Sequence, residues 1–189
     1  DRALPDPAEL LPGGAVVEVD LKETRTCAVT FLQLGNLKAT AIGEPHRDTN
    51  NPEVQHQTGA DYLTSLGPPE AMNLEAAPMG ESLGRSVMEL GTTLDQALCQ
   101  HLPQLLVTRR NYQIIDGVDR RGRHHRGMLE QSWRRGAGTA AIFLALKALR
   151  GSSAGAQLRT RHHIGYRAPI RDDQWVLCQS PTIVAEVVT

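Results

Sequence analysis

Arginine and histidine side chains are concentrated in residues 119–127, which read Asp-Arg-Arg-Gly-Arg-His-His-Arg-Gly. Arg109, Arg110, Arg134 and Arg135 are close to this stretch in the sequence. Guanidinium groups bind phosphate through paired hydrogen bonds, and glycine lets the backbone approach a ligand closely. We therefore expect an anion-binding loop here. Its candidate ligand-binding residues are Arg120, Arg121, Arg123, His124, Arg126 and Arg135.

The charge distribution along the chain bears on which anion this loop would face. Residues 1–100 contain 6 Lys and Arg against 15 Asp and Glu, whereas residues 101–189 contain 14 against 6. This asymmetry indicates either that the two halves dock on each other or that the basic half binds an anionic partner. Nucleic acid, a phosphorylated cofactor and an acidic protein surface would each suit the loop. In the alternative interpretation, the loop is solvated and faces the acidic half of the same chain.

The histidines are a second group of candidate functional residues. They include the pairs at 124–125 and 162–163, together with His46 and His56. A metal ion needs three or four converging ligands, and adjacent histidines on a strand point to opposite faces of the sheet. Each pair therefore offers only one inward ligand. We predict no metal site, and we expect one histidine of such a pair to lie in a cleft while the other is exposed.

Common catalytic and nucleotide-binding motifs are missing from the sequence. There is no GxSxG nucleophile motif, and no Rossmann glycine fingerprint follows a predicted strand. Residues 135–139, Arg-Gly-Ala-Gly-Thr, resemble a glycine-rich phosphate loop only superficially, because we predict that they interrupt a helix rather than follow a strand. Their closely spaced glycines are interpreted as allowing tight packing against a sheet.

The C-terminal part has a more specific pattern. Residues 162–177 read His-His-Ile-Gly-Tyr-Arg-Ala-Pro-Ile-Arg-Asp-Asp-Gln-Trp-Val-Leu, and Ser-Pro-Thr follows at 180–182. This stretch resembles the C-terminal hotdog domain of the acyl-CoA thioesterase II family over residues 157–182. There an acidic residue and a histidine open a strand, an aromatic residue and a proline end it, and Arg-x-Asp forms the turn. A plain β-hairpin is the alternative interpretation of the same residues.

The thioesterase resemblance implies a set of catalytic residues. The catalytic Asp of that family falls at His162, which would have to act as the general base on water. The hydroxyl-bearing residue of the family falls at Ser180 or Thr182. The substitution of His162 for the acid puts the activity in doubt even where the fold is shared, because function depends on sites rather than folds.

Hydrophobic periodicity and turn residues predict the following elements. We expect a polar connection over 44–80 and helices over 81–101 and 128–149, the second of them buried. Strands are expected at 17–21, 28–34, 37–42, 105–107, 112–115, 157–166 and 174–188, with turns at Gly35-Asn36 and over 168–173.

These elements predict an α+β fold in which one or more antiparallel sheets pack on long helices, with a hotdog-like arrangement as one candidate. We divide the chain into an N-terminal arm (1–14), an acidic α+β half (15–103) and a basic α+β half with the buried helix (104–189). No apolar run is long enough to span a membrane. The three scattered cysteines suggest a reducing compartment, cytoplasm or organelle matrix. The start at Asp1 suggests a processed or truncated chain.

The preferred functional hypothesis is an acyl-CoA thioester hydrolase, or a related acyl-CoA-binding enzyme, in which the arginine loop holds the coenzyme A phosphates. In this hypothesis the acyl chain lies along the Ala-rich helix and the enzyme needs no cofactor. The first alternative is a non-enzymatic module that binds RNA or another polyanion through residues 109–135. The second is a subunit of an oligomeric assembly, joined through the oppositely charged halves.

Overall fold

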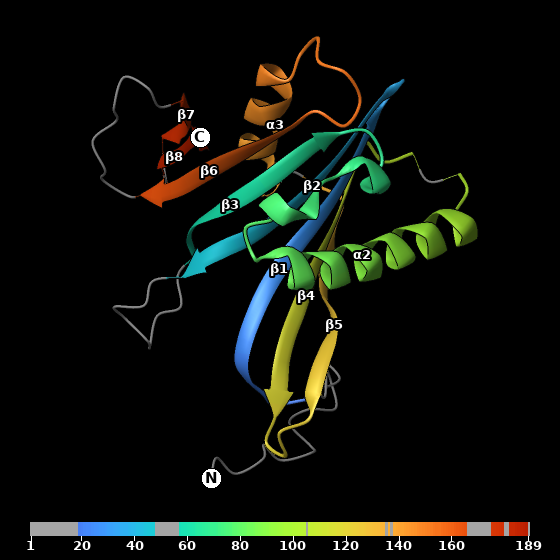
Figure 1. Cartoon of the computed structure of the whole chain (residues 1–189), viewed down its shortest axis with the longest axis vertical. Helices are drawn as coiled ribbons and strands as arrows, with labels where there is room; N and C mark the ends of the chain where they lie inside the picture. Colours follow the sequence, from blue (N-terminus) through green and yellow to red (C-terminus); the bar gives the residue numbers. More distant parts are fainter. Residues whose placement is uncertain are drawn as a thin grey trace, which may run out of the picture.

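A computed structural model of the protein describes residues 19–47, 57–104, 106–134, 136, 138–165, 175–179 and 182–188. The chain begins with three strands, continues with two short 3-10 helices and a long helix, and ends with five strands and a second helix (Figure 1). In chain order the elements are β1 (Leu21–Leu34), β2 (Leu37–Arg47), β3 (Gln57–Leu66), η1 (Pro69–Ala71), η2 (Leu74–Ala76), α2 (Glu81–His101), β4 (Arg109–Asp119), β5 (His124–Ser132), α3 (Thr139–Ala148), β6 (Gln157–Gly165), β7 (Trp175–Gln179) and β8 (Thr182–Val188).

The described strands form one eight-stranded sheet in the order β5-β4-β1-β2-β3-β6-β8-β7, and every neighbouring pair is antiparallel. The predicted α+β class is therefore confirmed. β1 lies next to β4, so a strand from the acidic half of the chain pairs directly with one from the basic half. Among the described residues, no helix has the length and apolar character needed to cross a membrane.

The first hairpin was correctly predicted from its turn. Gly35 and Asn36 connect β1 to β2, and Gly35 has a φ of +57°, in the left-handed region that glycine adopts without strain. The helix predicted over 81–101 is α2, with the same bounds. The expected strand over 17–21 is not observed as such, because β1 begins only at Leu21 and Val17 lies outside the described residues.

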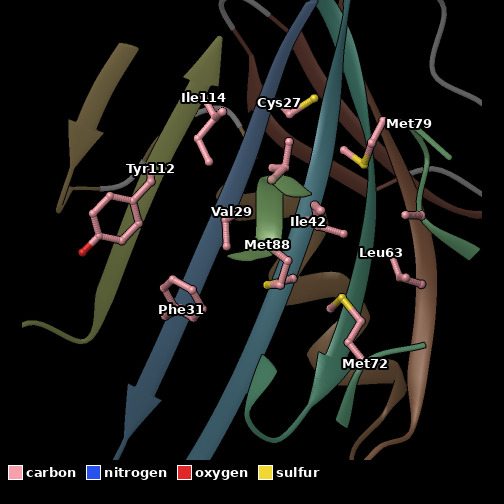
Figure 2. Packing of buried hydrophobic residues seen from close by; sticks show 12 residues of the cluster. Cys27, Val29, Phe31, Ile42, Leu63, Met72, Met79, Met88, Tyr112 and Ile114 are labelled. Carbon is pink, nitrogen blue, oxygen red and sulfur yellow. The ribbon is translucent and has the colours of Figure 1, made fainter. Parts of the chain in front are cut away.

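The two helices cover opposite faces of the sheet. Alternate residues of β1, namely Cys27, Val29 and Phe31, pack in a cluster that includes Val87 and Met88 of α2 (Figure 2). The members of this cluster are Cys27, Val29, Phe31, Ile42, Leu63, Met72, Ala77, Met79, Val87, Met88, Tyr112 and Ile114. Because side chains alternate along a strand, the even-numbered residues of β1 face the other side, where α3 packs.

The α3 face has a smaller apolar core. Ala41, Ala60 and Tyr62 pack there with Ala141 and Ile142 of α3. The expectation that this helix is buried holds for part of it, since Ala141, Ile142 and Ala145 are buried, whereas the Phe143 side chain is 53% exposed. The small core leaves room on this face for polar side chains next to the start of α3.

The predicted long connection over 44–80 is wrong, because it contains the end of β2, all of β3 and both 3-10 helices. β3 lies in the middle of the sheet and is buried on both faces, with Tyr62 on one side and Leu63 on the other. A strand buried on both faces lacks the alternation of apolar and polar residues by which exposed strands are recognised.

The predicted helix over 128–149 is also wrong in its first half. Residues 128–132 belong to β5, and α3 begins only at Thr139. The sequence Met-Leu-Glu-Gln-Ser has good helix propensity, but backbone pairing with β4 overrides this weak local preference.

Three smaller predictions concern the ends of the strands. Leu106 and Val107 precede β4 and are not part of a strand. The strand predicted over 157–166 is β6, and the one predicted over 174–188 is divided into β7 and β8, which pair with each other. The arm at 1–14 and the turn at 168–173 lie outside the described residues.

Candidate functional site: a polar cleft at the start of α3

The arginine-rich loop proves to be the tight turn between β4 and β5, and carboxylates of the chain contact most of its cations. Arg123 Nε donates to Asp119 Oδ2 at 2.8 Å and Arg126 Nε donates to Asp116 Oδ1 at 2.6 Å. Arg120 Nε donates to Asp20 Oδ2 at 2.8 Å, which is a contact with the acidic half. These ion pairs reduce the positive charge that the turn presents to an external anion.

The remaining candidate residues of this group are placed as follows. His124 and His125 lie 2.9 and 3.1 Å from carboxylate oxygens of Asp116 and Asp119. The exposed Arg121 donates its backbone N–H to Asp119 Oδ1 at 2.8 Å. Hydrogen bonds from the turn hold the pKa of the Asp119 carboxyl well below its usual range, so it stays charged and keeps these contacts. Arg135 lies outside the described residues.

The candidate catalytic residues are only partly described. His162 lies on β6 opposite Ala185 of β8, whereas Thr182 lies opposite Gly165. These two positions are three residues apart along the strand, or roughly 10 Å. His162 is fully buried, while its neighbour His163 is exposed, as expected for adjacent histidines on a strand. Ser180 lies outside the described residues.

A different group of polar residues lines a cleft of about 220 Å³ on the α3 face of the sheet. The cleft lies between β1, β4, β5 and the segment that leads into α3. Its lining residues are Ala28, Tyr62, Arg109, Asn111, Gln113, Glu130, Ser132, Arg134, Gly136 and Gly138. Six of them come from alternate positions on neighbouring strands, namely 109, 111 and 113 on β4, 130 and 132 on β5, and 28 on β1.

The glycine-rich segment is part of this cleft. β5 ends at Ser132, and α3 begins at Thr139, so the segment follows a strand and leads into a helix. The prediction that it interrupts a helix is wrong, and the reason is the same misassignment of residues 128–132. This strand, glycine-rich loop and helix N-terminus in succession are the local arrangement in which many proteins bind phosphate.

Arg109 is the most unusual side chain in the cleft. It is only 8% exposed, and no carboxylate among the described residues is paired with it. Its Nη1 donates to the backbone carbonyl of Arg134 at 2.5 Å, but its Nε is buried and has no hydrogen-bond partner within the described part of the chain. Burial lowers the pKa of the guanidinium somewhat from its ordinary value. A buried charge without a counterion is costly, and such groups are normally paired.

The start of α3 is held by two hydrogen bonds of its own, and in one of them the Thr139 N–H donates to the Gly136 carbonyl at 3.0 Å. Gly138 at its N-cap makes no side-chain cap, and the first turn contains no acidic residue that would complement the helix dipole. The Gly136 N–H donates to Thr139 Oγ1 at 2.9 Å, which fixes the loop against the helix. A Cβ at Gly136 would lie 3.9 Å from Arg109 Nη2, so the backbone at Gly136 lies beside the guanidinium.

Asn111 presents its amide to the same cleft. Its Oδ1 accepts a hydrogen bond from the buried Thr30 hydroxyl at 2.8 Å. This contact fixes the side-chain amide and leaves the NH₂ group as a donor. Arg109, Arg134 and Asn111 therefore give the cleft an excess of donors, and Glu130 is its only ionisable acid among the described lining residues.

One family model matches residues 2–184, which is nearly the whole chain. The chain belongs to the family described as "Protein of unknown function (DUF3182)". No curated protein and no solved structure matches it.

The cleft of this DUF3182 protein contains several residues that sequence reasoning did not assign to a site. Arg109 was noted only as a neighbour of the arginine-rich loop, and Tyr62 was placed in the predicted connection. The signal that was available is the alternation at the start of β4. Arg109, Asn111 and Gln113 are polar at every second position, whereas the residues between them pair with or pack against α2. Polar residues on a single face of a central strand indicate a polar site on that face.

Tyr62 forms the inner wall of the cleft in a slot made by two glycines. Its ring lies over Gly43, its cross-strand neighbour on β2, and its hydroxyl end lies against Gly138. A Cβ at Gly43 would come within 2.3 Å of Tyr62 Cδ1 and Cε1. On its other side Tyr62 stacks on His162, with ring centroids 5.9 Å apart. Burial raises the pKa of the Tyr62 phenol to about 12, so the hydroxyl remains protonated and is a donor.

We expect Gly43→Ala to destabilise the protein by about 1–3 kcal/mol, because the added methyl group overpacks the slot and displaces the Tyr62 ring. Gly127→Ala is the matched control, since Gly127 is also in a strand but a Cβ there would meet nothing within 4 Å. Urea denaturation measures both variants. If Gly43→Ala is as stable as Gly127→Ala, the slot does not constrain the ring.

Proposed function

We propose that this protein binds a phosphate-bearing small molecule in the polar cleft at the start of α3. The observation that carries the proposal is Arg109, a buried guanidinium that lacks a paired carboxylate within the described part of the chain. A bound phosphate would supply the missing counterion. It would also accept hydrogen bonds from the guanidinium, because guanidinium and phosphate match in bidentate geometry.

The rest of the cleft supports phosphate over a carboxylate ligand. A phosphate group has three or more oxygens to satisfy, and the cleft offers donors from several directions. Arg109 and Asn111 lie on β4, Arg134 follows β5, and the positive end of the α3 dipole lies beside Gly136 and Gly138. A single carboxylate would leave several of these donors without a partner.

Nucleotides and coenzyme A thioesters are the two ligand classes that we propose, since both present phosphate groups of this kind. The coenzyme A class keeps the acyl-CoA assignment from the thioesterase resemblance, with the phosphates held at Arg109 rather than at the β4–β5 turn. Thioester hydrolysis by His162, Ser180 and Thr182 stays a prediction of that resemblance. An assay of acyl-CoA hydrolysis with His162→Ala tests it separately from binding.

The acidic side chain of Glu130 bears on how a phosphate would bind in this cleft. Its carboxylate lines the same cleft as the two arginines and would repel a bare phosphate. Mg²⁺ commonly bridges carboxylates and substrate phosphates, so the binding measurements are made with and without this ion.

The test is a calorimetric titration of the full chain with ATP, ADP, coenzyme A, acetyl-CoA and inorganic phosphate. We expect at least one of these ligands to bind, and we expect tighter binding with Mg²⁺ in wild-type protein but not in Glu130→Gln. Arg121→Met, which removes an exposed charge of the β4–β5 turn, is the control and is expected to bind normally. A single-stranded RNA arm with a salt series tests the polyanion alternative, because such binding weakens steeply with salt. Failure of all the phosphate ligands at millimolar concentration refutes the proposal.

A further inference from the structure

A second cavity, of about 260 Å³, lies beside the polar cleft and has a different character. Its lining is mainly leucine and aromatic side chains, together with two threonines and two arginines. The residues are Leu32, Leu34, Leu37, Thr108, Arg109, Trp133, Arg134, Thr139, Phe143 and Leu146. Thr139, Phe143 and Leu146 are four and three residues apart, so one face of α3 forms a wall of the cavity.

This cavity contains unusually exposed apolar side chains. Leu34 is 65% exposed, Leu37 44%, Trp133 41% and Phe143 53%. They come from the β1–β2 hairpin, from the segment after β5 and from α3, which are distant in sequence. Single exposed apolar residues are common on protein surfaces, but a cluster around a cavity indicates a binding surface.

The two cavities are neighbours that share part of their lining. Arg109 and Arg134 line both the polar cleft and the apolar cavity, and no other residues are common to the two linings. A ligand with its phosphate on Arg109 would therefore lie at the edge of the apolar cavity. The volumes of about 220 and 260 Å³ together fall within the range of roughly 300–1,000 Å³ typical of small-molecule sites.

We propose that the apolar cavity holds the hydrocarbon chain of the same ligand whose phosphate binds in the polar cleft, so that the ligand is an amphiphilic phosphate or acyl thioester. This inference rests on the proposed function. Six of the ten lining residues are leucine or aromatic, so most of the wall offers no hydrogen-bond partner to the polar edge of a purine ring. A hydrocarbon chain needs no hydrogen-bond partners, and its binding free energy becomes more favourable with every methylene that is removed from water.

The shared arginines also favour a ligand over a second protein chain. A protein segment bound against Leu34, Leu37 and Phe143 would have to place a carboxylate on Arg109 to satisfy its buried guanidinium. An amphiphilic phosphate meets both requirements in one molecule, with the charged head on the arginine and the chain among the apolar side chains.

The experiment compares inorganic phosphate with ethyl, butyl and octyl phosphate, each below its micelle-forming concentration. In wild-type protein we expect the affinity to rise by roughly threefold to fourfold per buried methylene. In Phe143→Ala the gain per methylene should fall, while the affinity for inorganic phosphate should remain unchanged. Leu129→Ala is the control, because Leu129 is 48% exposed on β5 but does not line the cavity.

The outcomes separate this inference from the proposed function. If inorganic phosphate binds but the alkyl chains add no affinity, the inference is wrong and the proposed function stands. If neither phosphate nor alkyl phosphates bind, both are wrong. Octanol binding as tightly as octyl phosphate would show that the cavity acts independently of Arg109. A dimer that Phe143→Asp converts to a monomer, measured by light scattering, would assign the apolar surface to a second copy of the chain instead.

Discussion

Replacing Arg109 with methionine is expected to weaken phosphate binding by about 100-fold or more. Hydrogen bonds to charged groups contribute about 1.5–3 kcal/mol each, and the guanidinium can make two of them to one phosphate. Loss of about 3 kcal/mol corresponds to roughly a 100-fold change in dissociation constant. Calorimetric titration with the tightest phosphate ligand of the panel measures this change directly.

The same substitution should leave the free energy of unfolding nearly unchanged. Methionine removes a buried charge that is costly without its ligand, and this gain offsets the lost hydrogen bond to the Arg134 carbonyl. An arginine with a purely structural role would give the opposite result, namely a less stable protein. Loss of binding with retained stability is therefore the result that assigns Arg109 to the ligand.

Arg110 is the matched control, because it is the next residue on the same strand and points to the opposite face. Its Nε and Nη2 donate to the two carboxylate oxygens of Asp95 at 2.5 and 3.1 Å, and Tyr112 donates to the same carboxylate. Arg110→Met leaves Asp95 without this partner and should cost about 1–3 kcal/mol of stability. Phosphate binding should remain. If Arg109→Met and Arg110→Met behave alike, the two faces do not have the distinct roles described here.

The stability of the protein is expected to fall as the pH drops from about 6.5 toward 4, and His162 is the main cause. Burial, followed by the nearby His163 and His46, lowers the pKa of His162 from 6.5 to about 4. Both ring nitrogens are buried and neither has a hydrogen-bond partner among the described residues. The folded protein therefore keeps His162 neutral at a pH where an unfolded chain would protonate it.

The sign of the effect follows from proton binding. Between pH 6.5 and about 4 the unfolded state binds more protons at this histidine than the folded state, so the free energy of unfolding decreases as the pH falls. The contribution is fully present above pH 6.5, and its loss across the window amounts to at most roughly 3 kcal/mol, since one pKa unit is about 1.4 kcal/mol. Urea denaturation at several pH values in this range measures it.

His162→Phe provides the control for the pH dependence. Phenylalanine is apolar and can keep the stacking on Tyr62, but it does not titrate. We expect this variant to show a shallower decrease of stability between pH 6.5 and 4 than the wild type. Equal slopes for the two proteins would mean that carboxylates elsewhere, rather than His162, dominate the acid sensitivity.

The sequence predicted some elements well because their signals are local. The Gly35-Asn36 turn requires a conformation that few residue pairs adopt, and the leucine spacing of α2 repeats over its whole length. β3 and β5 were missed for a different reason. Their strand conformation depends on neighbours that are remote in sequence, β2 and β6 for β3, and β4 for β5. Pairing with a remote strand leaves no pattern in the local sequence by which either strand could be recognised.

The candidate site was missed for a related reason. The sequence shows how many arginines lie near one another, but it does not show which of them have carboxylate partners. The arginines of the β4–β5 turn are paired with Asp116 and Asp119, whereas Arg109 lines a cleft with Tyr62, Asn111 and Gly136 and has no ion pair with a described carboxylate. The informative property, a charge without a partner, appears only in three dimensions.

β1 contributes to both layers of the protein through alternate residues. Val29 and Phe31 pack under α2, while Ala28 and Thr30 face the side of the sheet that holds the cleft, where Thr30 orients Asn111. The odd-numbered residues of β1 therefore contribute to the packing of the core, and the even-numbered residues contribute to the face that holds the cleft. If the cleft binds a ligand as proposed, substitutions at the even-numbered positions act mainly on the cleft, and those at the odd-numbered positions act mainly on the packing under α2.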